Sequence, residues 1–516
     1  MKIHHSLLAT AAACALPATA QNLPPKYNIV FIISDQHKLA VTGCYGDKTV
    51  KTPNIDALAA AGVKFTRIYT PSPLSAPARA ALMTGTYPST NDVLLHQMLF
   101  EKNGKQVPTE AGKHRIPGYK PTLETWGEYM KQHGYGTAAI GKMHVHGELA
   151  KNVDPLCPEG NSMGFDVSDM RFYTFFPGGH YKEWKGSPDY YNRYREIGEY
   201  KTYFKNNNYN QNLKPTLVKN EDDIFDFAVA YKSGEYIKSM AAQGKPFFIH
   251  VGLEKPHKPW TTEQRFYDMY ATKEMQLPKT AYDWHDNGRY PYVKKGTHAQ
   301  LFDPAAPVDE NKIKTSMRAY YACVTEMDAA VGRIVELTKK LGVYDNTIFV
   351  YTTDHGEHLY QHGMHEKHNM FEEAVNVPFI ISCPALLPKG ATCNSIGSVI
   401  DILPTLAELL GLQPLKHWEG KSLLGQITAK KPWERVVYSE FYEDGFTPWG
   451  DGKYVPMRMY LDNKYKYTYT HGYIDQLYDT AADPDEMHNL AFDKSGKYAA
   501  TIEHYRFLAS KTGASG

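Results

Sequence analysis

The chain has 516 residues, which is long for one domain and suggests one large α/β domain or a large domain with a smaller companion. Its 57 basic and 56 acidic residues nearly cancel, which excludes a global electrostatic field that would favour nucleic acid or an anionic membrane surface. Any strong charge effect must therefore be local to a site.

The first 20 residues have the pattern of a signal peptide. Lys2 precedes an apolar stretch at residues 7–16, and the small residues Ala-Thr-Ala at 18–20 form a cleavage pattern. The apolar stretch is too short to anchor the chain in a bilayer, and no later segment is apolar for long enough to span one. We therefore expect a periplasmic or secreted protein without stable membrane insertion.

Two residue types leave alternatives open. Of the six cysteines, Cys14 lies in the signal peptide, and the five that remain are an odd number without zinc-site spacing. Cys383 and Cys393 could pair, which the sequence cannot decide.

Many of the 38 tyrosines cluster at residues 172–209, where they could pack in a surface insertion or provide stacking platforms for sugars.

The mature chain opens with an apolar, β-branched run at residues 28–34 that shows no alternation with polar residues. Such a run predicts a strand that is buried on both faces, as in a parallel sheet. A helix is expected next, with Thr52 as its cap, Pro53 at its first position and Gly62 at its end.

Further strands are predicted at residues 137–141, 246–253 and 347–351. Apolar residues spaced by three or four predict a long amphipathic helix at residues 315–341. Strands that are separated by helices predict an α/β fold with a large, mostly parallel sheet sandwiched by helices.

The pattern changes near the carboxyl terminus. Residues 457–461 and 464–470 flank an Asp-Asn turn and predict a β-hairpin. We therefore expect a smaller carboxyl-terminal α+β domain that begins near Leu412. The expected organisation is a signal peptide at residues 1–20, a catalytic domain at 21–411 and the smaller domain at 412–516.

Polar residues gather just past the predicted strand ends, where open α/β sheets place their sites. Asp35 and Gln36 follow the first strand, and a carboxylate beside an amide oxygen suits a hard cation such as calcium, although such pairs more often cap a turn. The other strands are followed by Gly-Lys-Met-His at 141–144, Lys-Pro-His-Lys-Pro at 255–259 and Thr-Asp-His-Gly-Glu at 353–357.

The run Ser-Ala-Pro-Ala-Arg at residues 75–79 is followed by Leu-Met-Thr-Gly at 82–85. A serine without a neighbouring base is a poor nucleophile, because its hydroxyl is protonated at neutral pH. Without further information, the run predicts a loop ahead of a helix that starts near Pro77.

This run resembles the signature of the type I sulfatases, which is Cys or Ser, any residue, Pro, any residue, Arg, followed by Thr-Gly. The residues in register with the signature are Ser75, Pro77, Arg79, Thr84 and Gly85. In that family the Cys or Ser is oxidised to formylglycine, whose hydrated form is the nucleophile. The resemblance implies an alkaline-phosphatase-like fold and a sulfuric ester hydrolase.

The remaining clusters resemble other parts of the same family's site. Lys142 and His144 match the element that touches formylglycine and sulfate, His257 matches the histidine motif, and Lys367 matches the lysine that grips sulfate. The catalytic residues implied are Ser75, Arg79, Lys142, His144, His257 and Lys367. The implied ligands of one divalent cation, expected to be Ca²⁺, are Asp35, Gln36, Ser75, Asp354 and His355.

The sequence departs from the common family pattern in three places. Gln36 replaces the usual second Asp, and His355 stands where Asn is frequent, as in choline sulfatases and phosphonate monoester hydrolases. Loss of a carboxylate leaves the choice between calcium and another divalent metal open. Ser75 in place of Cys resembles bacterial enzymes that are matured by a radical formylglycine maturase, which we expect as a partner.

The resemblance also implies a mechanism. A sulfate monoester is negatively charged, so a divalent cation with Lys142, Lys367 and Arg79 would neutralise that charge. One hydroxyl of the hydrated aldehyde attacks sulfur, and His257 protonates the departing alkoxide. His144 then deprotonates the second hydroxyl, so that sulfate leaves and the aldehyde reforms.

The leading functional hypothesis is hydrolysis of a sulfate ester on a carbohydrate, such as a glycosaminoglycan fragment. Export, the Tyr-rich stretch and the Lys-Pro-His-x-Pro form, which resembles that of iduronate-2-sulfatases, support it. The alternatives are a choline-sulfatase-like or aryl sulfatase and a phosphonate or phosphodiester hydrolase. If Ser75 stayed unmodified, a protein that binds sulfated glycans without hydrolysing them would also fit.

Overall fold

The computed structural model describes residues 26–94, 99–102, 105–108, 122–145, 163–171, 215–221, 224–258, 260–282, 309–429, 431–442 and 456–511. The expected signal peptide and the Tyr-rich stretch at 172–209 lie outside these ranges. Within them, no helix combines the length and the apolar character that crossing a membrane requires.

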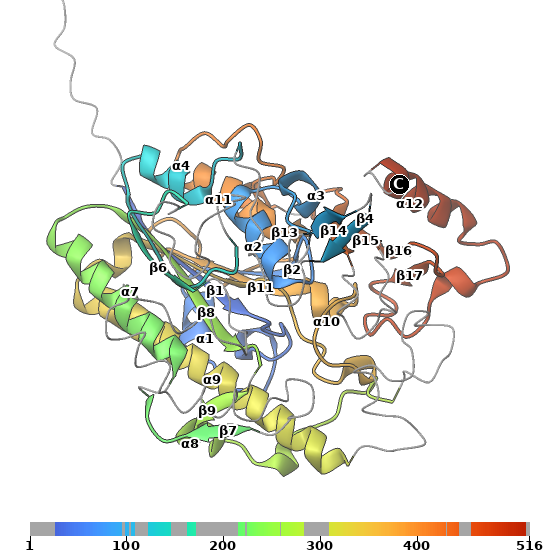
Figure 1. Cartoon of the computed structure of the whole chain (residues 1–516), viewed down its shortest axis with the longest axis horizontal. Helices are drawn as coiled ribbons and strands as arrows, with labels where there is room; N and C mark the ends of the chain where they lie inside the picture. The colour runs from blue at the N-terminus through green and yellow to red at the C-terminus, as the bar shows by residue number, and fades with distance from the viewer. Residues whose placement is uncertain are drawn as a thin grey trace, which may run out of the picture.

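A nine-stranded sheet forms the centre of the molecule (Figure 1). Its order is β12-β2-β11-β10-β1-β8-β5-β6, with β13 also paired to β2. Only β11 runs antiparallel to its neighbours among the described strands of this sheet, so the prediction of a mostly parallel sheet is confirmed. The strands are β1 (Asn28–Asp35), β2 (Val63–Tyr69), β5 (Gly136–Lys142), β6 (Val167–Arg171), β8 (Phe247–Pro256), β10 (Thr347–Thr353), β11 (Asn376–Ser382), β12 (Ala391–Cys393) and β13 (Gly397–Ser398).

Helices cover both faces of this sheet, and the side chains of β1 show why. Val30 and Ile32 point into a core beneath α1, α7 and α9, whereas Ile29, Phe31 and Ile33 point into a second core beneath α2, α4 and α11. The predicted strand with two buried faces is therefore confirmed. The helices are α1 (Pro53–Ala60), α2 (Ser75–Thr84), α3 (Pro88–Asn91), α4 (Trp126–Gln132), α7 (Phe225–Ala242), α8 (Gln264–Tyr267), α9 (Glu310–Lys340), α10 (Glu372–Val375), α11 (Ile402–Leu409) and α12 (Ala499–Lys511).

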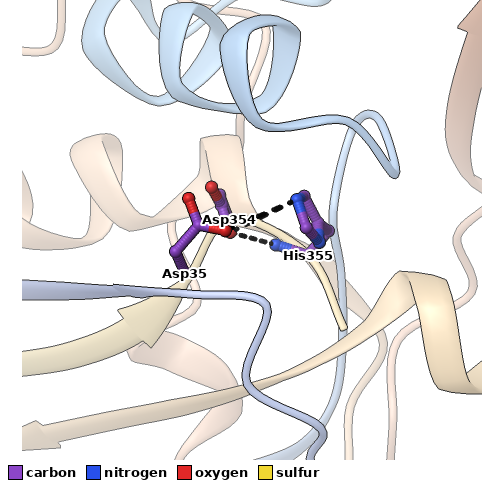
Figure 2. Close-up of side chains that lie close together, drawn as sticks. All are labelled: Asp35, Asp354 and His355. Carbon is purple, nitrogen blue, oxygen red and sulfur yellow. Dashed lines mark hydrogen bonds and ion pairs between the residues drawn. The ribbon is translucent and has the colours of Figure 1, made fainter. Parts of the chain in front are cut away.

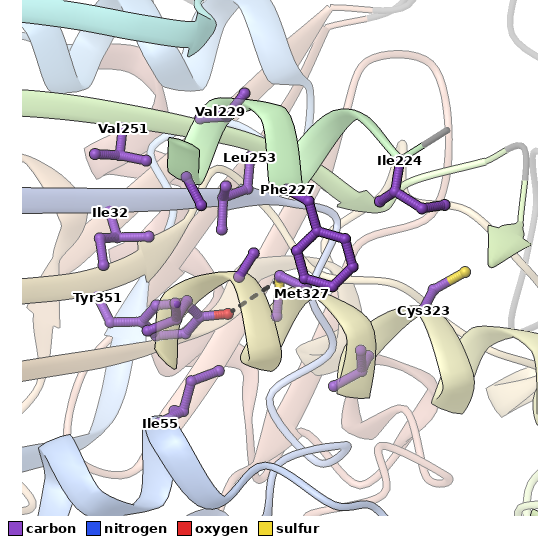
Figure 3. Close-up of a cluster of buried hydrophobic side chains, with 14 of the residues drawn as sticks. Ile32, Ile55, Ile224, Phe227, Val229, Val251, Leu253, Cys323, Met327 and Tyr351 are labelled. Atoms are coloured by element: carbon purple, nitrogen blue, oxygen red, sulfur yellow. Dashed lines mark hydrogen bonds between the residues drawn. The ribbon is translucent and has the colours of Figure 1, made fainter. Parts of the chain in front are cut away.

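The core beneath α7 and α9 joins segments that are distant in sequence (Figure 3). Phe227 of α7 and Met327 of α9 face Ile32 of β1 and Leu253 of β8. The long amphipathic helix is confirmed, but it begins five residues before the predicted start at 315. It begins there because the side chain of Asp309 accepts the N–H of Asn311 at 2.9 Å and caps the helix.

The N-terminus of α1 is capped from a distant helix. Thr52 and Pro53 occupy the predicted positions, but the side chain of Thr52 does not cap the helix. Instead, the buried carboxylate of Asp328 on α9 accepts the backbone N–H groups of Asn54 and Ile55 at 3.1 and 2.8 Å. This contact ties α1 to α9 on the same face of the sheet.

A four-stranded antiparallel sheet with α12 beside it forms the carboxyl-terminal part of the fold (Figure 1). Its strands are β14 (Val437–Tyr442), β15 (Pro456–Leu461), β16 (Tyr465–Thr470) and β17 (Gln476–Asp479). The pairing of β15 with β16 confirms the predicted hairpin, while the boundary near Leu412 stays a prediction. Two small sheets pair β3 (Leu99–Lys102) with β4 (Lys105–Pro108) and β7 (Thr216–Val218) with β9 (Thr261–Glu263).

The cysteines of the described residues do not pair. Cys44, Cys323, Cys383 and Cys393 form no disulfide, so the described residues contain no bridge between Cys383 and Cys393.

Replacement of Asp328 by alanine should lower the free energy of unfolding by about 1–3 kcal/mol, because α1 loses its acceptors inside the core. Chemical denaturation followed by circular dichroism measures this change. Glu336→Ala is the matched control, since it removes an exposed carboxylate from the same helix and should leave stability nearly unchanged. An equal loss in both variants would contradict the capping role of Asp328.

Candidate active site

The polar residues at the strand ends meet at one edge of the main sheet. Asp35 ends β1, Lys142 ends β5, His257 directly follows β8 and Asp354 directly follows β10. These four strands are neighbours and run parallel, so their carboxyl ends lie at the same edge. The site predicted at this edge is therefore assembled by the sheet itself.

Ser75 is the first residue of α2, so the helix predicted to start near Pro77 begins two residues earlier. The helix includes Pro77 because a proline in the first turn lacks only an N–H that has no partner within the helix. The hydroxyl of Ser75 donates to Nε2 of His355 at 2.8 Å and is fully buried. A helix N-terminus stabilises negative charge on an oxygen that is placed there.

Arg79 lies one turn after Ser75 on α2 and connects the strand ends. Its Nε donates to Oδ2 of Asp354 at 2.8 Å, and one terminal nitrogen lies 3.2 Å from Oδ2 of Asp35. The other terminal nitrogen donates to the carbonyl of Lys142 at 3.0 Å. The guanidinium thus fixes β1, β5 and β10 relative to α2.

Asp35, Asp354 and His355 form a group that can hold a metal ion (Figure 2). One ligand atom from each lies within 4.8 Å of the others, and all three side chains are buried. No donor among the described residues bonds to Oδ1 of Asp35, which leaves this buried oxygen available to a cation. His355 donates Nδ1–H to the carbonyl of Gly356 at 3.0 Å, so its Nε2 keeps the lone pair that a metal needs.

Neighbouring cations keep the carboxyl group of Asp35 ionised. Burial alone would raise the pKa of this carboxyl, but neighbouring positive charges, that of Lys142 first, hold the pKa well below its usual range. The ammonium of Lys142 lies 2.7 Å from Oδ2 of Asp35. The two carboxylates, the imidazole and the hydroxyl of Ser75 are oxygen and nitrogen donors that fit a divalent cation.

His257 is buried beside Lys367. Burial, and then the charges of Lys367 and Lys142, hold the pKa of His257 well below its usual range, so its imidazole is neutral. Its Nδ1–H donates to the carbonyl of Lys258 at 2.6 Å, and its Nε2 accepts from the ammonium of Lys367 at 3.2 Å. His257 and Lys367 are therefore brought together from segments 110 residues apart.

Gln36 and His144 both have left-handed backbone conformations at strand ends, with φ of 63° and 61°. The amide oxygen of Gln36 accepts from the ammonium of Lys367 at 2.5 Å. His144 is buried two residues beyond Lys142. The structure thus places Gln36 against the lysine that was predicted to grip sulfate.

Three buried charged residues of the site did not figure among the predicted site residues. They are Lys258, Glu357 and Glu366. Each lies beside a predicted residue or inside a recognised run in the sequence, and this adjacency was the available signal. The contacts of these residues depend on the fold, because Glu366 and its partner Gln36 are 330 residues apart.

Family models match nearly all of the described chain. The sulfatase model matches residues 27–412, and the model for the carboxyl-terminal part of N-sulphoglucosamine sulphohydrolase matches residues 360–507. Among curated proteins, a sulfatase of Formosa agariphila is 29% identical over 95% of this chain and 87% of its own length. An N-acetylglucosamine-6-O-sulfatase of Bacteroides thetaiotaomicron is 25% identical over 97% of this chain and 88% of its own length.

Solved structures share the same fold. A phosphonate monoester hydrolase of Agrobacterium radiobacter superposes with a TM-score of 0.72 at 23% identity, covering 95% of each chain. A 2-O glycosaminoglycan sulfatase superposes with a TM-score of 0.68 at 22% identity, covering 94% of this chain and 92% of its own. Because the sulfatase model matches residues 27–412, this chain belongs to the sulfatase family, the sulfuric ester hydrolases with the alkaline-phosphatase-like fold.

Proposed function

We propose that this chain hydrolyses sulfate monoesters on carbohydrates of the glycosaminoglycan type, through a formylglycine made from Ser75. The observation that carries the proposal is the buried hydroxyl of Ser75 at a helix N-terminus, 2.8 Å from His355 and next to carboxylates and cations. The names of two relatives support a carbohydrate substrate, since one is an N-acetylglucosamine-6-O-sulfatase and another is an ulvan-active sulfatase.

The charges of the site suit an anionic ester. Asp35, Asp354 and His355 would hold a divalent cation, which would polarise sulfate oxygens and lower the pKa of a hydroxyl at position 75. Gln36 follows Asp35 in the sequence and would add its amide oxygen as a further ligand. Lys367, which lies next to His257, would attract the sulfate through its positive charge. The carboxylates that hold the divalent cation would then repel the ester less, and Lys367 would attract it.

Hydrolysis would then proceed in two steps at position 75. One hydroxyl of the hydrated aldehyde attacks sulfur, and the bond from sulfur to the sugar oxygen breaks. His257 supplies the proton that the sugar alkoxide needs, for which the bound sulfate and the developing alkoxide must first raise its pKa. His144 removes the proton of the second hydroxyl, the C–O bond to sulfate breaks, and water hydrates the aldehyde that reforms.

We also propose how the protein is exported and matured. Residues 1–20 would direct export to the periplasm or the medium of a bacterium, and a radical maturase that accepts serine would oxidise Ser75. The catalytic part would comprise residues 21–411, with the smaller carboxyl-terminal part from 412 onward.

A second candidate is a choline-sulfatase-like, aryl sulfatase or phosphonate hydrolase activity. It is favoured by Gln36 beside Asp35, by a choline-sulfatase of Rhizobium meliloti at 26% identity and by the shared fold of a phosphonate monoester hydrolase. A panel of sulfated disaccharides, choline sulfate, an aryl sulfate and a phosphonate monoester separates the two candidates.

Mass spectrometry of the protein produced with a serine-accepting maturase should find the Ser75 peptide lighter by two hydrogens, as oxidation of the alcohol to an aldehyde requires. This protein should desulfate the disaccharides of the panel, and Ser75→Ala should abolish turnover. Ser239→Ala, which changes an exposed serine on α7, is the control and should keep full activity. An oxidised protein that hydrolyses no sulfate ester of the panel would contradict the proposal.

Removal of a metal ligand should weaken binding of the cation. Asp354→Asn should lower the affinity for Ca²⁺ by at least about tenfold, because a neutral amide replaces a buried carboxylate ligand. Isothermal titration calorimetry on chelator-treated protein measures the affinity, and Asp345→Asn, an exposed change, should leave it unaltered. Equal affinity in all three proteins would place the metal elsewhere.

The role of His257 should depend on the leaving group. His257→Ala should lower kcat by about 10²–10⁴-fold on a sulfated sugar, whose alkoxide needs a proton, and much less on nitrophenyl sulfate, whose phenolate does not. Steady-state kinetics on both substrates, with exposed His488→Ala as control, gives the comparison. Equal losses on the two substrates would mean that His257 does not protonate the leaving group.

A further inference from the structure

The side chain of Gln36 lies between two carboxylates and one ammonium. Its Nε2 donates to Oε2 of Glu366 at 3.0 Å and to Oε2 of Glu357, while its Oε1 accepts from Lys367 at 2.5 Å. A carboxylate only accepts and an ammonium only donates. The amide orientation is therefore fixed, because exchanging its oxygen and nitrogen would place oxygen against oxygen and N–H against N–H.

Glu366 is the centre of this network. Its Oε1 lies 2.6 Å from the ammonium of Lys258, and its Oε2 lies 3.2 Å from that of Lys367. Its backbone N–H donates to Oε1 of Glu357 at 2.6 Å. The side chain is only 4% exposed, so its charge must be compensated by these partners.

The backbone of Glu366 adds a second sign of constraint. Its φ is 74°, a left-handed conformation that a residue with a Cβ rarely adopts. Such a conformation persists where the surroundings hold it, and strained residues of this kind gather at functional sites. In Glu366 this conformation accompanies a carboxylate that reaches Lys258, Lys367 and Gln36 at the same time.

We propose that Glu366 is a positioning residue that supplies the negative charge absent from position 36 and holds Lys367 and the Gln36 amide oxygen toward the sulfate and metal site. The proposal explains why position 36 carries an amide. A carboxylate there would face Glu357 and Glu366 and be repelled by both, whereas the NH₂ group of Gln36 bonds to both.

The network also predicts that positions 36 and 366 are coupled. A carboxylate at position 36 should be tolerated only when one of the two facing carboxylates is neutral. The two changes should then compensate for one another, which independent sites would not do. The metal and sulfate roles rest on the proposed function, while the coupling itself is tested by binding.

The experiment compares Glu366→Gln, Glu366→Asp, Gln36→Glu and the double variant Gln36→Glu/Glu366→Gln in the full-length, oxidised protein. Glu366→Gln should lower the affinity for inorganic sulfate about tenfold, because Lys367 loses its charged partner. The KM for nitrophenyl sulfate should rise by a similar factor, and kcat should change less. Glu366→Asp should recover part of that loss. Calorimetry with sulfate and with Ca²⁺ gives readouts that do not depend on turnover.

The double variant provides the decisive comparison. Gln36→Glu alone should weaken sulfate and Ca²⁺ binding, and addition of Glu366→Gln should restore affinity toward that of the unchanged protein. Glu486→Gln is the matched control, since Glu486 is a buried carboxylate paired with Lys466 in the carboxyl-terminal sheet, and it should alter neither affinity. If Glu366→Gln does not fold, Glu366→Asp decides alone, because weaker sulfate binding supports the proposal and unchanged binding overturns it.

Two results would overturn the proposal. One is a Glu366→Gln protein with unchanged sulfate affinity and KM, and the other is a double variant that binds no better than Gln36→Glu. Failure of the proposed function looks different, since a protein that turns over no sulfate ester can still bind sulfate and Ca²⁺ and show the coupling.

Discussion

The guanidinium of Arg79 is the contact on which the rest of the site depends. It donates to the carboxylates of Asp35 and Asp354 and to the backbone carbonyls of Ser34 and Lys142. A planar guanidinium stays charged when buried and offers donors in a fixed fork, which a lysine could not do from the same place. One side chain on α2 thereby fixes the ends of three strands around Ser75. It also holds Asp35 and Asp354, two of the three residues that can hold a metal ion.

The chemistry of the site follows from how its charges are paired. Lys142 is paired with Asp35, and Glu366 is paired with both Lys258 and Lys367. Buried pairs are costly to assemble and much costlier to break, because removal of one partner leaves a charge without compensation. This arrangement keeps ammonium groups in a water-poor site, where they attract an anion more strongly than they would in solvent. As a consequence, few substitutions that change a charge are tolerated in this site.

The carboxyl-terminal sheet supports the segment that leads to Ser75. The backbone N–H of Glu440 on β14 donates to the carbonyl of Pro71 at 2.9 Å. Leu74, the residue before Ser75, packs in one hydrophobic cluster with Phe441 and Met457 of the same sheet. The start of α2 is thus held between the main sheet and the smaller one, so the smaller sheet contributes to the geometry of a site that contains none of its residues.

The sequence alone determined the elements and the residue types of the site. The buried strand at 28–34, the long helix and the carboxyl-terminal hairpin follow from local patterns, and the signature around Ser75 follows from its spacing. The tertiary structure alone decided that α2 begins at Ser75, that Asp328 caps α1, and that Glu366 lies against Gln36. The reason is physical: periodicity and turn chemistry act over a few residues, whereas the partners of a buried charge are chosen by chain segments that meet only when the sheet is complete.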